Sequence, residues 1–182
     1  PVILDPGGAG ASRLRREMAE SLIREVRVDI LRGNVSEVSF AAGLASREKG
    51  VDVSEADRGI DRTEAALAAA RRLGCTVAVT GEVDVVTDGR RTARIRGGSS
   101  MMARVTGTGC MTSALAGAFA GAERGDAFPA AVAALASMGI AGETAFEKAG
   151  HLGCGSFHIA LLDAVGGLNE KSIRERAEIE EG

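Results

Sequence analysis

The sequence predicts one α/β domain, a mostly parallel sheet with helices on both faces. Three observations support this fold class. Short apolar runs alternate with longer helical patterns along the chain. With 182 residues, 45% of them hydrophobic and 26% charged, the chain has an ordinary globular composition and can bury a core. No internal repeat or linker divides it.

The first strand is expected at Val2–Leu4, an apolar run closed by Asp5-Pro6 and a glycine-rich turn. A second strand is expected at Val28–Leu31, and Ser36 is expected to cap a short helix that runs toward Gly43. Between the two strands a helix is predicted, because apolar residues recur at helical spacing: Leu14, Met18, Leu22 and Val26.

The middle of the chain predicts a loop at Gly50–Ser54 and then a helix, with Ile60, Leu67, Ala70 and Leu73 on one side. A third buried strand is expected at Thr76–Thr80. Two further strands, Val83–Thr87 and Thr92–Ile95, flank Asp88-Gly89, which is a strong hairpin signal.

The last part predicts a strand at Met101–Val105 and then three helices, at Thr108–Ala122, Phe128–Lys148 and Ser156–Val165. Residues 1–168 are expected to form the domain. Residues 169–182 are polar and are expected to be a loosely attached helix or a frayed tail. The opening residues resemble the middle of a sheet and lack an initiator Met, so the sequence is interpreted as truncated at its N-terminus.

Composition argues against several classes of protein. A net charge of −3, five Phe and no Trp or Tyr give a poor surface for nucleic acid. The apolar stretches are rich in Ala and Gly and predict buried helices rather than a membrane span, and no signal peptide is visible. Three cysteines without CxxC spacing predict neither disulfides nor a zinc site, which fits a reducing, cytoplasmic location.

Residues with chemical interest cluster where strands end. They are Asp5, the segment 32–37, the segment 80–84 and the segment 107–110. Because ligands of open α/β sheets bind outside the carboxyl ends of the strands, we expect one active site there.

The segment Gly107-Thr108-Gly109-Cys110 lies between a predicted strand and a long helix. Two glycines allow close backbone approach, and a helix N-terminus offers free N–H groups and a positive dipole end to an anion. The alternative is a tight turn without a ligand. There is no GxxxxGK[ST] sequence, so a P-loop kinase is excluded.

The longer string Val105–Ala114 closely resembles a segment of the hydroxyethylthiazole kinases, which carry GTGC where most ribokinase-like enzymes have an Asp at the fourth position. The resemblance extends from residue 1 to about Leu168. Further segments carry it: Leu4-Asp5-Pro6, Gly8–Ala11, Arg32–Glu37, Thr80–Asp84, Val86–Gly89, Gly139–Glu143 and Gly155–Phe157. It implies a ribokinase-like three-layer sandwich.

The resemblance implies that Cys110 is the catalytic base that accepts the proton of the substrate hydroxyl. A thiol at a helix N-terminus has a lowered pKa, which agrees with this role. The alternative for Cys110 is a buried core thiol. Gly107 is implied to contact the thiazole, and Thr108 and Gly109 to hold the transferring anion.

The resemblance also implies that Arg32 and Thr80 bind ATP, and that Asp5 and Glu37 hold Mg²⁺ directly or through water. Without a ligand, Arg32 would be a surface residue, Thr80 would cap its own turn, and Asp5 would stabilise the turn before Pro6. Asn34 fits either the kinase pattern or a helix cap.

Other polar residues are interpreted as structural. Asp84 is expected to tie down the hairpin. His151 and His158 match no ligand spacing, and Cys75 and Cys154 are expected to be core residues.

The implied activity is Mg²⁺- and ATP-dependent phosphorylation of hydroxyethylthiazole in thiamine biosynthesis or salvage, by a homotrimer. Two alternatives remain: a related kinase for a pyrimidine, a pyridoxal-type compound or a sugar, and a non-catalytic nucleotide-binding protein.

The chain also departs from the family. The family usually has Val where Gly7 stands, a His-Pro pair within Gly98–Ser100, and Pro where Cys154 stands. The altered Gly97–Ser100 loop is expected to affect substrate contacts or lid behaviour.

Overall fold

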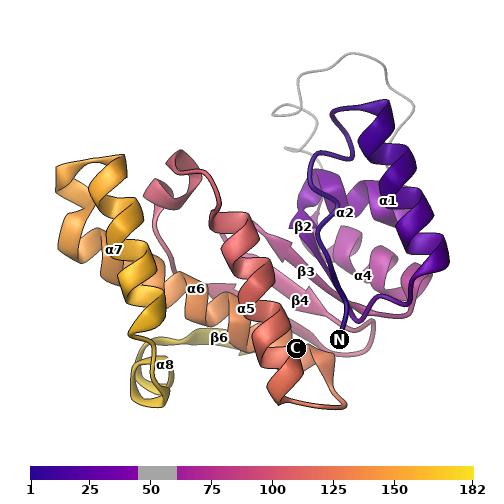
Figure 1. Cartoon of the computed structure of the whole chain (residues 1–182). Coiled ribbons are helices and arrows are strands. Elements are labelled where there is room, and N and C mark those ends of the chain that lie inside the picture. The colour runs from indigo at the N-terminus through magenta and orange to yellow at the C-terminus, as the bar shows by residue number, and fades with distance from the viewer. Residues whose placement is uncertain (45–60) are drawn as a thin grey trace.

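The computed structural model describes residues 1–44 and 61–182, and these form three layers (Figure 1). A six-stranded sheet is the middle layer. Helices α5 and α6 cover one face and α2 and α4 cover the other, while α7 packs on α6. The predicted sandwich with helices on both faces is therefore confirmed.

The strands lie in the sheet in chain order: β1 (Ile3–Leu4), β2 (Ile30–Asn34), β3 (Thr76–Thr80), β4 (Asp84–Thr87), β5 (Thr92–Arg96) and β6 (Glu178–Glu181). β1, β2 and β3 run parallel, whereas the pairs from β3 to β6 are antiparallel. The sheet is thus mixed rather than mostly parallel. The physical reason is local, because the short turn between β4 and β5 can join only antiparallel neighbours.

The helices follow the predicted pattern closely. They are α1 (Arg13–Glu25), α2 (Val35–Ala42), α4 (Arg62–Leu73), α5 (Thr108–Ala122), α6 (Ala127–Ala149), α7 (Cys154–Gly166) and α8 (Glu170–Arg176), with 3₁₀ helices at Ser100–Arg104 and Gly150–Leu152. The expected loop at Gly50–Ser54 and Ile60 lie outside the described residues.

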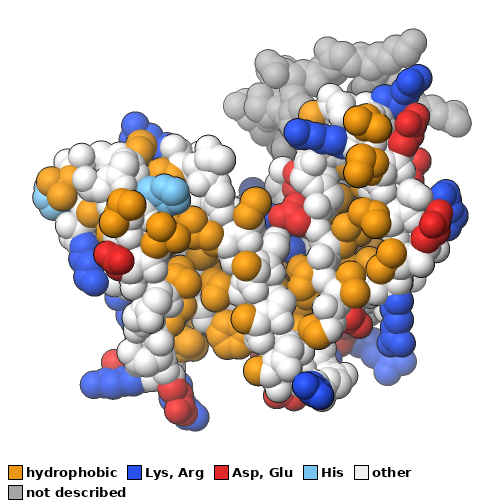
Figure 2. All heavy atoms as spheres, in the orientation of Figure 1, with side chains coloured by type: hydrophobic (Ala, Val, Ile, Leu, Met, Phe, Trp, Pro, Cys, Tyr) orange, Lys and Arg blue, Asp and Glu red, His pale blue; other side chains and the backbone are white. Residues whose placement is uncertain are grey.

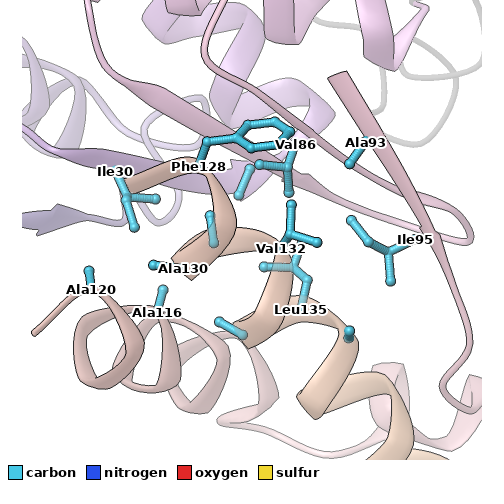
Figure 3. Close-up of a cluster of buried hydrophobic side chains, with 14 residues drawn as sticks. Ile30, Val86, Ala93, Ile95, Ala116, Ala120, Phe128, Ala130, Val132 and Leu135 are labelled. Carbon is cyan, nitrogen blue, oxygen red and sulfur yellow. The ribbon is translucent and has the colours of Figure 1, made fainter. Parts of the chain in front are cut away.

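The sheet buries side chains on both faces because successive residues of a strand point in opposite directions. On β2, Ile30 packs toward α5 and α6, whereas Leu31 packs toward α2 and α4. Figure 3 shows the first of these clusters, in which Phe128, Val132 and Leu135 of α6 meet the sheet. The central strands are therefore held from two sides.

Helix α6 is the most deeply buried helix of the described chain, with fourteen buried residues. Continued to Leu152, it is long and apolar enough to cross a membrane, but 67% of its apolar 18-residue stretch is buried inside the protein. Its packing between α5 and α7 accounts for its apolar composition.

Helix α1 has the predicted periodicity, but the apolar residues of that pattern, Leu14, Met18, Leu22 and Val26, do not enter the core, whereas Ile23 packs against the cluster of α2 and α4. Leu14 is 66% exposed and Met18 is 58% exposed, and Ala19 is the buried residue of this helix. Figure 2 shows hydrophobic side chains at the surface along this helix.

Three local expectations need correction. Asn34, not Ser36, caps α2, because its side chain accepts a hydrogen bond from the Glu37 amide. The segment expected as a strand at Met101–Val105 is the 3₁₀ helix Ser100–Arg104, which Ser99 caps while Met101 is buried against α6 and α7.

The C-terminal segment also differs from a loosely attached helix or frayed tail. It forms α8 and then β6, which pairs with β5 along its length. Backbone hydrogen bonds to β5 hold this polar strand although its residues are exposed.

Candidate active site

The carboxyl ends of the three parallel strands bring the predicted residues together. Asn34 pairs in register with Thr80, and Leu4 pairs with Leu31, so Asp5 follows β1 beside Arg32 of β2. The parallel arrangement confirms the expectation that these strand ends meet at one edge.

Arg32 is the centre of this edge. Its guanidinium donates from Nη1 to Asp5 Oδ2 at 3.1 Å and from Nη2 to Thr80 Oγ1 at 2.7 Å. Only 12% of the side chain is exposed, and Nε has no hydrogen-bond partner in the described chain. The side chain is thus held in place with donor capacity left, which suits a group that binds an anion.

Helix α5 begins beside this guanidinium. Gly107, with φ of 100°, is its N-cap and makes no side-chain cap hydrogen bond, so the first amides are not satisfied by a cap. A Cβ on Gly109 would lie 2.7 Å from Arg32 Nη1, so any side chain here would displace the guanidinium from its present position. The arrangement places a guanidinium and a helix N-terminus together, which favours a phosphate group.

Glu37 is fixed by backbone amides. Its Oε2 accepts from the Asn34 amide at 2.9 Å in a capping box, and its Oε1 accepts from the Gly8 amide at 2.9 Å. Glu37 therefore ties the turn after β1 to the start of α2.

A magnesium ion fits Asp5 better than Glu37. Asp5 Oδ2 accepts from Arg32 and from Ser113 Oγ, whereas no described group donates to Oδ1. Both oxygens of Glu37 are already occupied by amides. Among the described residues there is no group of three or more His, Cys, Asp or Glu that could enclose a metal ion. The donor set suits Mg²⁺, which takes few carboxylates and completes its shell with phosphates and water.

A cavity of about 600 Å³ opens next to Arg32. One side, which we call the strand-end wall, is formed by Arg32, Thr80, Gly81, Glu82 and Asp84. Another part of the lining, which we call the glycine wall, is the loop Gly97–Ser100. Thr108 and Gly109 of α5 also line the cavity, so the predicted ATP-binding and anion-binding residues share it.

Asp84 is part of this cavity and was expected to be structural. Its Oδ1 accepts from the Gly81 amide at 2.8 Å, so it does hold the turn that follows β3. Burial raises the pKa of its carboxyl to about 6, although the Gly81 amide and the charges of Arg32 and Arg62 act in the opposite direction.

Sequence reasoning expected the loop of the glycine wall to affect substrate contacts or lid behaviour, but it did not place this loop at the cavity of Arg32. Gly97 has φ of 128° and Gly98 has φ of 91°, conformations that favour glycine. Gly139 of α6 lies against this loop, since a Cβ on Gly139 would be 3.4 Å from the Gly98 nitrogen. The glycines were visible in the sequence, but no local pattern indicated that α6 is their partner.

Cys110 and Gly107 lie outside the cavity lining. Cys110 is the third residue of α5 and is exposed, so it is not the buried core thiol of the alternative interpretation. Cys75 is buried, and burial raises its pKa to about 11, which agrees with a core role. His151 is exposed in the 3₁₀ helix before α7 and makes no described hydrogen bond.

The comparison with protein families matches residues 1–171 to the hydroxyethylthiazole kinase family. A hydroxyethylthiazole kinase of Clostridium botulinum is 49% identical over 98% of this chain and 65% of its own length. One of Ruminiclostridium cellulolyticum is 51% identical over 100% of this chain and 66% of its length. The chain thus spans just under two thirds of the length of these curated relatives.

Solved structures agree. The hydroxyethylthiazole kinase of Pyrococcus horikoshii has a TM-score of 0.86 and 39% identity, covering 100% of this chain and 65% of that one. A Staphylococcus aureus pyridoxal kinase in complex with ADP has a TM-score of 0.55 and 18% identity, covering 78% of this chain and 52% of that one. At its identity the second likeness shows the fold alone, and together the two likenesses confirm the predicted ribokinase-like fold.

Proposed function

Because the chain belongs to the hydroxyethylthiazole kinase family, we propose that it transfers the γ-phosphoryl group of ATP to the hydroxyl group of 4-methyl-5-(2-hydroxyethyl)thiazole. This reaction is a step of thiamine biosynthesis or salvage. It matches the names of the relatives from Clostridium botulinum and Ruminiclostridium cellulolyticum.

The observation that carries the proposal is the position of Arg32. Its guanidinium lies against Gly109 at the uncapped N-terminus of α5 and lines a cavity of about 600 Å³. A nucleotide in this cavity would meet Arg32, Thr80 and the first amides of α5 with its phosphates. Phosphoryl transfer depends mainly on such positioning and charge stabilisation.

Within this proposal Asp5 would hold Mg²⁺ through Oδ1, to which no described group donates, directly or through water, and Glu37 would act through water because its own oxygens accept backbone amides. The ion, when bound, neutralises charge on the phosphate oxygens. The hydroxyl oxygen of the alcohol forms the new bond to the γ-phosphorus as the bond from that phosphorus to the β-phosphate oxygen breaks. ADP leaves, and the hydroxyl proton passes to the thiolate of Cys110.

Cys110 suits this role because it is exposed at the start of α5, beside the cavity but outside its lining. The alcohol would therefore approach from the side of Gly107 and Cys110, while the nucleotide occupies the cavity. Assembly as a homotrimer and a cytoplasmic location belong to the same proposal, without nucleic acid or a membrane as partner.

The test is ATP-dependent phosphorylation of hydroxyethylthiazole with Mg²⁺, beside a panel containing a pyrimidine alcohol, pyridoxal and a sugar. It should be run on this chain and on a version that reaches the length of its relatives. Selective turnover of the thiazole by either protein supports the proposal. Selective turnover of another alcohol would assign the chain to a related kinase, and nucleotide binding without any turnover would make it a non-catalytic binding protein.

A further inference from the structure

We propose that Glu143 of α6 is a positioning residue for the nucleotide. It fixes the glycine wall by accepting a hydrogen bond from the Gly98 amide, and Arg176 of the C-terminal segment holds its carboxylate in place. This inference rests on the proposed function to the extent that it takes the cavity of Arg32 and Thr80 as the nucleotide site. Glu143 does not itself line the cavity.

The first two residues of the glycine wall, Gly97 and Gly98, need support from outside the loop. Its second half is self-supported, because Ser99 Oγ accepts from the Met101 amide at 3.2 Å and the Ser99 carbonyl accepts from the Met102 amide at 2.9 Å. Gly97 and Gly98 both have positive φ values and bear no side chain that could anchor them. Glycine also has the most conformational freedom to lose, so an unsupported pair would be mobile.

Glu143 provides that support. Its Oε1 accepts a hydrogen bond from the Gly98 amide at 3.1 Å, across 45 residues of sequence. A Cβ on Gly97 would lie 2.9 Å from the same oxygen, so the carboxylate lies directly against the loop. Hydrogen bonds with one charged partner are the stronger ones, which makes this contact a good anchor.

The other oxygen of the carboxylate is held from the C-terminal segment. Arg176 Nη2 donates to Glu143 Oε2 at 3.1 Å and to Glu147 Oε1 at 2.8 Å, and its Nη1 donates to Thr144 Oγ1 at 3.1 Å. About a third of each side chain of the Arg176–Glu143 pair is exposed, so the pair is partly shielded from water. Arg176 thus sets the direction in which Glu143 faces Gly98.

The C-terminal segment also holds the strand that leads into the loop. Arg96, the last residue of β5, pairs in register with Glu178 of β6, and Gly97 follows directly. Arg176 and β6 are therefore two adjacent supports of one loop, one through a side chain and one through the backbone. A segment that looked like a polar tail contributes to the shape of the cavity.

The test measures the dissociation constant of a non-hydrolysable ATP analogue with Mg²⁺ on the whole chain. Glu143→Ala is expected to raise this constant about 5- to 10-fold, less than the full loss of a charge-assisted hydrogen bond, because Glu143 acts on the nucleotide only through the loop. Glu143→Gln is expected to stay within about 2- to 3-fold of the parent, because its amide oxygen can still accept from Gly98. This rescue by the conservative variant separates positioning from a need for charge.

Glu147→Ala is the matched control. It removes a carboxylate that also binds Arg176, one turn further along α6, but makes no contact with Gly98. Its dissociation constant should equal that of the parent. A melting temperature for each variant shows which proteins are folded, and the amide resonance of ¹⁵N-labelled Gly98 should move in Glu143→Ala and not in Glu147→Ala.

If Glu143→Ala does not fold, Arg176→Met replaces it, because it frees the Glu143 carboxylate without removing it. The dissociation constant of the ATP analogue is expected to rise about 2- to 4-fold in that variant. This is less than in Glu143→Ala, because the hydrogen bond from Gly98 is weakened but not removed. Equal affinities in Glu143→Ala and Glu147→Ala, or a Glu143→Gln variant as weak as Glu143→Ala, would overturn the inference. A parent protein that binds no nucleotide would instead overturn the proposed function, so the two failures are distinguishable.

Discussion

The two walls of the cavity are built in different ways. The strand-end wall is held by charged and polar side chains, above all the hydrogen bonds from Arg32 to Asp5 and Thr80. The glycine wall contributes no charged side chain of its own. It is held by backbone conformation, by the close approach of Gly139, and by the bond from Gly98 to Glu143.

This difference separates two tasks. Charged groups at strand ends can bind phosphate and accept or stabilise charge, so they determine the chemistry that the cavity supports. A wall of glycines gives shape, since it lets a ligand approach the backbone closely but requires support from neighbouring elements. Substitutions in the strand-end wall should therefore weaken nucleotide binding by removing charge, and substitutions in the glycine wall should weaken it by changing the shape of the cavity.

The largest expected effect concerns a residue outside both walls. Cys110→Ala removes the proposed proton acceptor at the start of α5 and should lower kcat by about 10²- to 10⁴-fold. Nucleotide affinity should be unchanged, because Cys110 does not line the cavity. Cys110→Asp should keep or raise activity relative to the parent. Steady-state kinetics and nucleotide titration measure this, and complete inactivity of Cys110→Asp would contradict the proton-acceptor role.

Arg32→Ala should be the most damaging change within the strand-end wall. It removes the guanidinium from the proposed phosphate site and leaves Asp5 without its ion-pair partner. Nucleotide affinity is expected to fall by about 10- to 100-fold. Titration with the ATP analogue measures this change. Arg32→Lys keeps the charge but lacks the planar fork, so it should recover only part of the affinity; full affinity of Arg32→Ala would exclude Arg32 from the site.

Gly139→Val tests the shape of the cavity at the glycine wall, beside which Gly139 itself lines the cavity. A Cβ at this position would already lie 3.4 Å from the Gly98 nitrogen, and the two further methyl groups would push the loop away. Nucleotide affinity is expected to fall by about tenfold.

The control for this change is Gly121→Ala in α5, where an added Cβ meets nothing within 4 Å. It should leave affinity unchanged and stabilise the helix by about 0.5–1 kcal/mol. A Gly139→Val protein that binds nucleotide as well as the parent would show that the wall tolerates displacement.

Asp84→Asn gives the smallest expected effect, and it depends on pH. Because burial raises the pKa of Asp84 to about 6 from an ordinary value of 3.8, the folded protein binds more protons than the unfolded chain between these values. The free energy of unfolding therefore falls as pH rises from about 4 to about 6, and ionised Asp84 costs stability at pH 7.

Replacement by Asn removes this cost while its amide oxygen can still accept from Gly81. The variant is expected to be more stable than the parent by about 1–2 kcal/mol at pH 8, with the difference disappearing near pH 4. Denaturant unfolding at both pH values measures this, with Glu82→Gln, an exposed neighbour, as the control. A difference that grows on acidification would contradict the raised pKa.

Much of the fold was predictable because its signals are local. The strand Thr76–Thr80, the hairpin around Asp88-Gly89 and the helices after Gly107 lie where apolar runs, turn residues and helical periodicity indicate. Helix α1 shows the limit of this evidence. Its periodicity predicts the helix correctly, but it does not show that Leu14 and Met18 remain at the surface.

The sequence by itself determined the helices and most of the strands, and it identified the strand-end residues from Asp5 to Cys110 as candidates for one site. It could do so because propensity and hydrophobic periodicity depend on neighbours along the chain, and because parallel strands of an open α/β sheet place their carboxyl ends at one edge. Only the tertiary structure decided which loop lines the cavity together with the strand-end wall, that Glu143 binds Gly98, and that Arg176 and β6 support the same loop. These contacts join residues far apart in the chain, and the packing that brings them together has no local pattern.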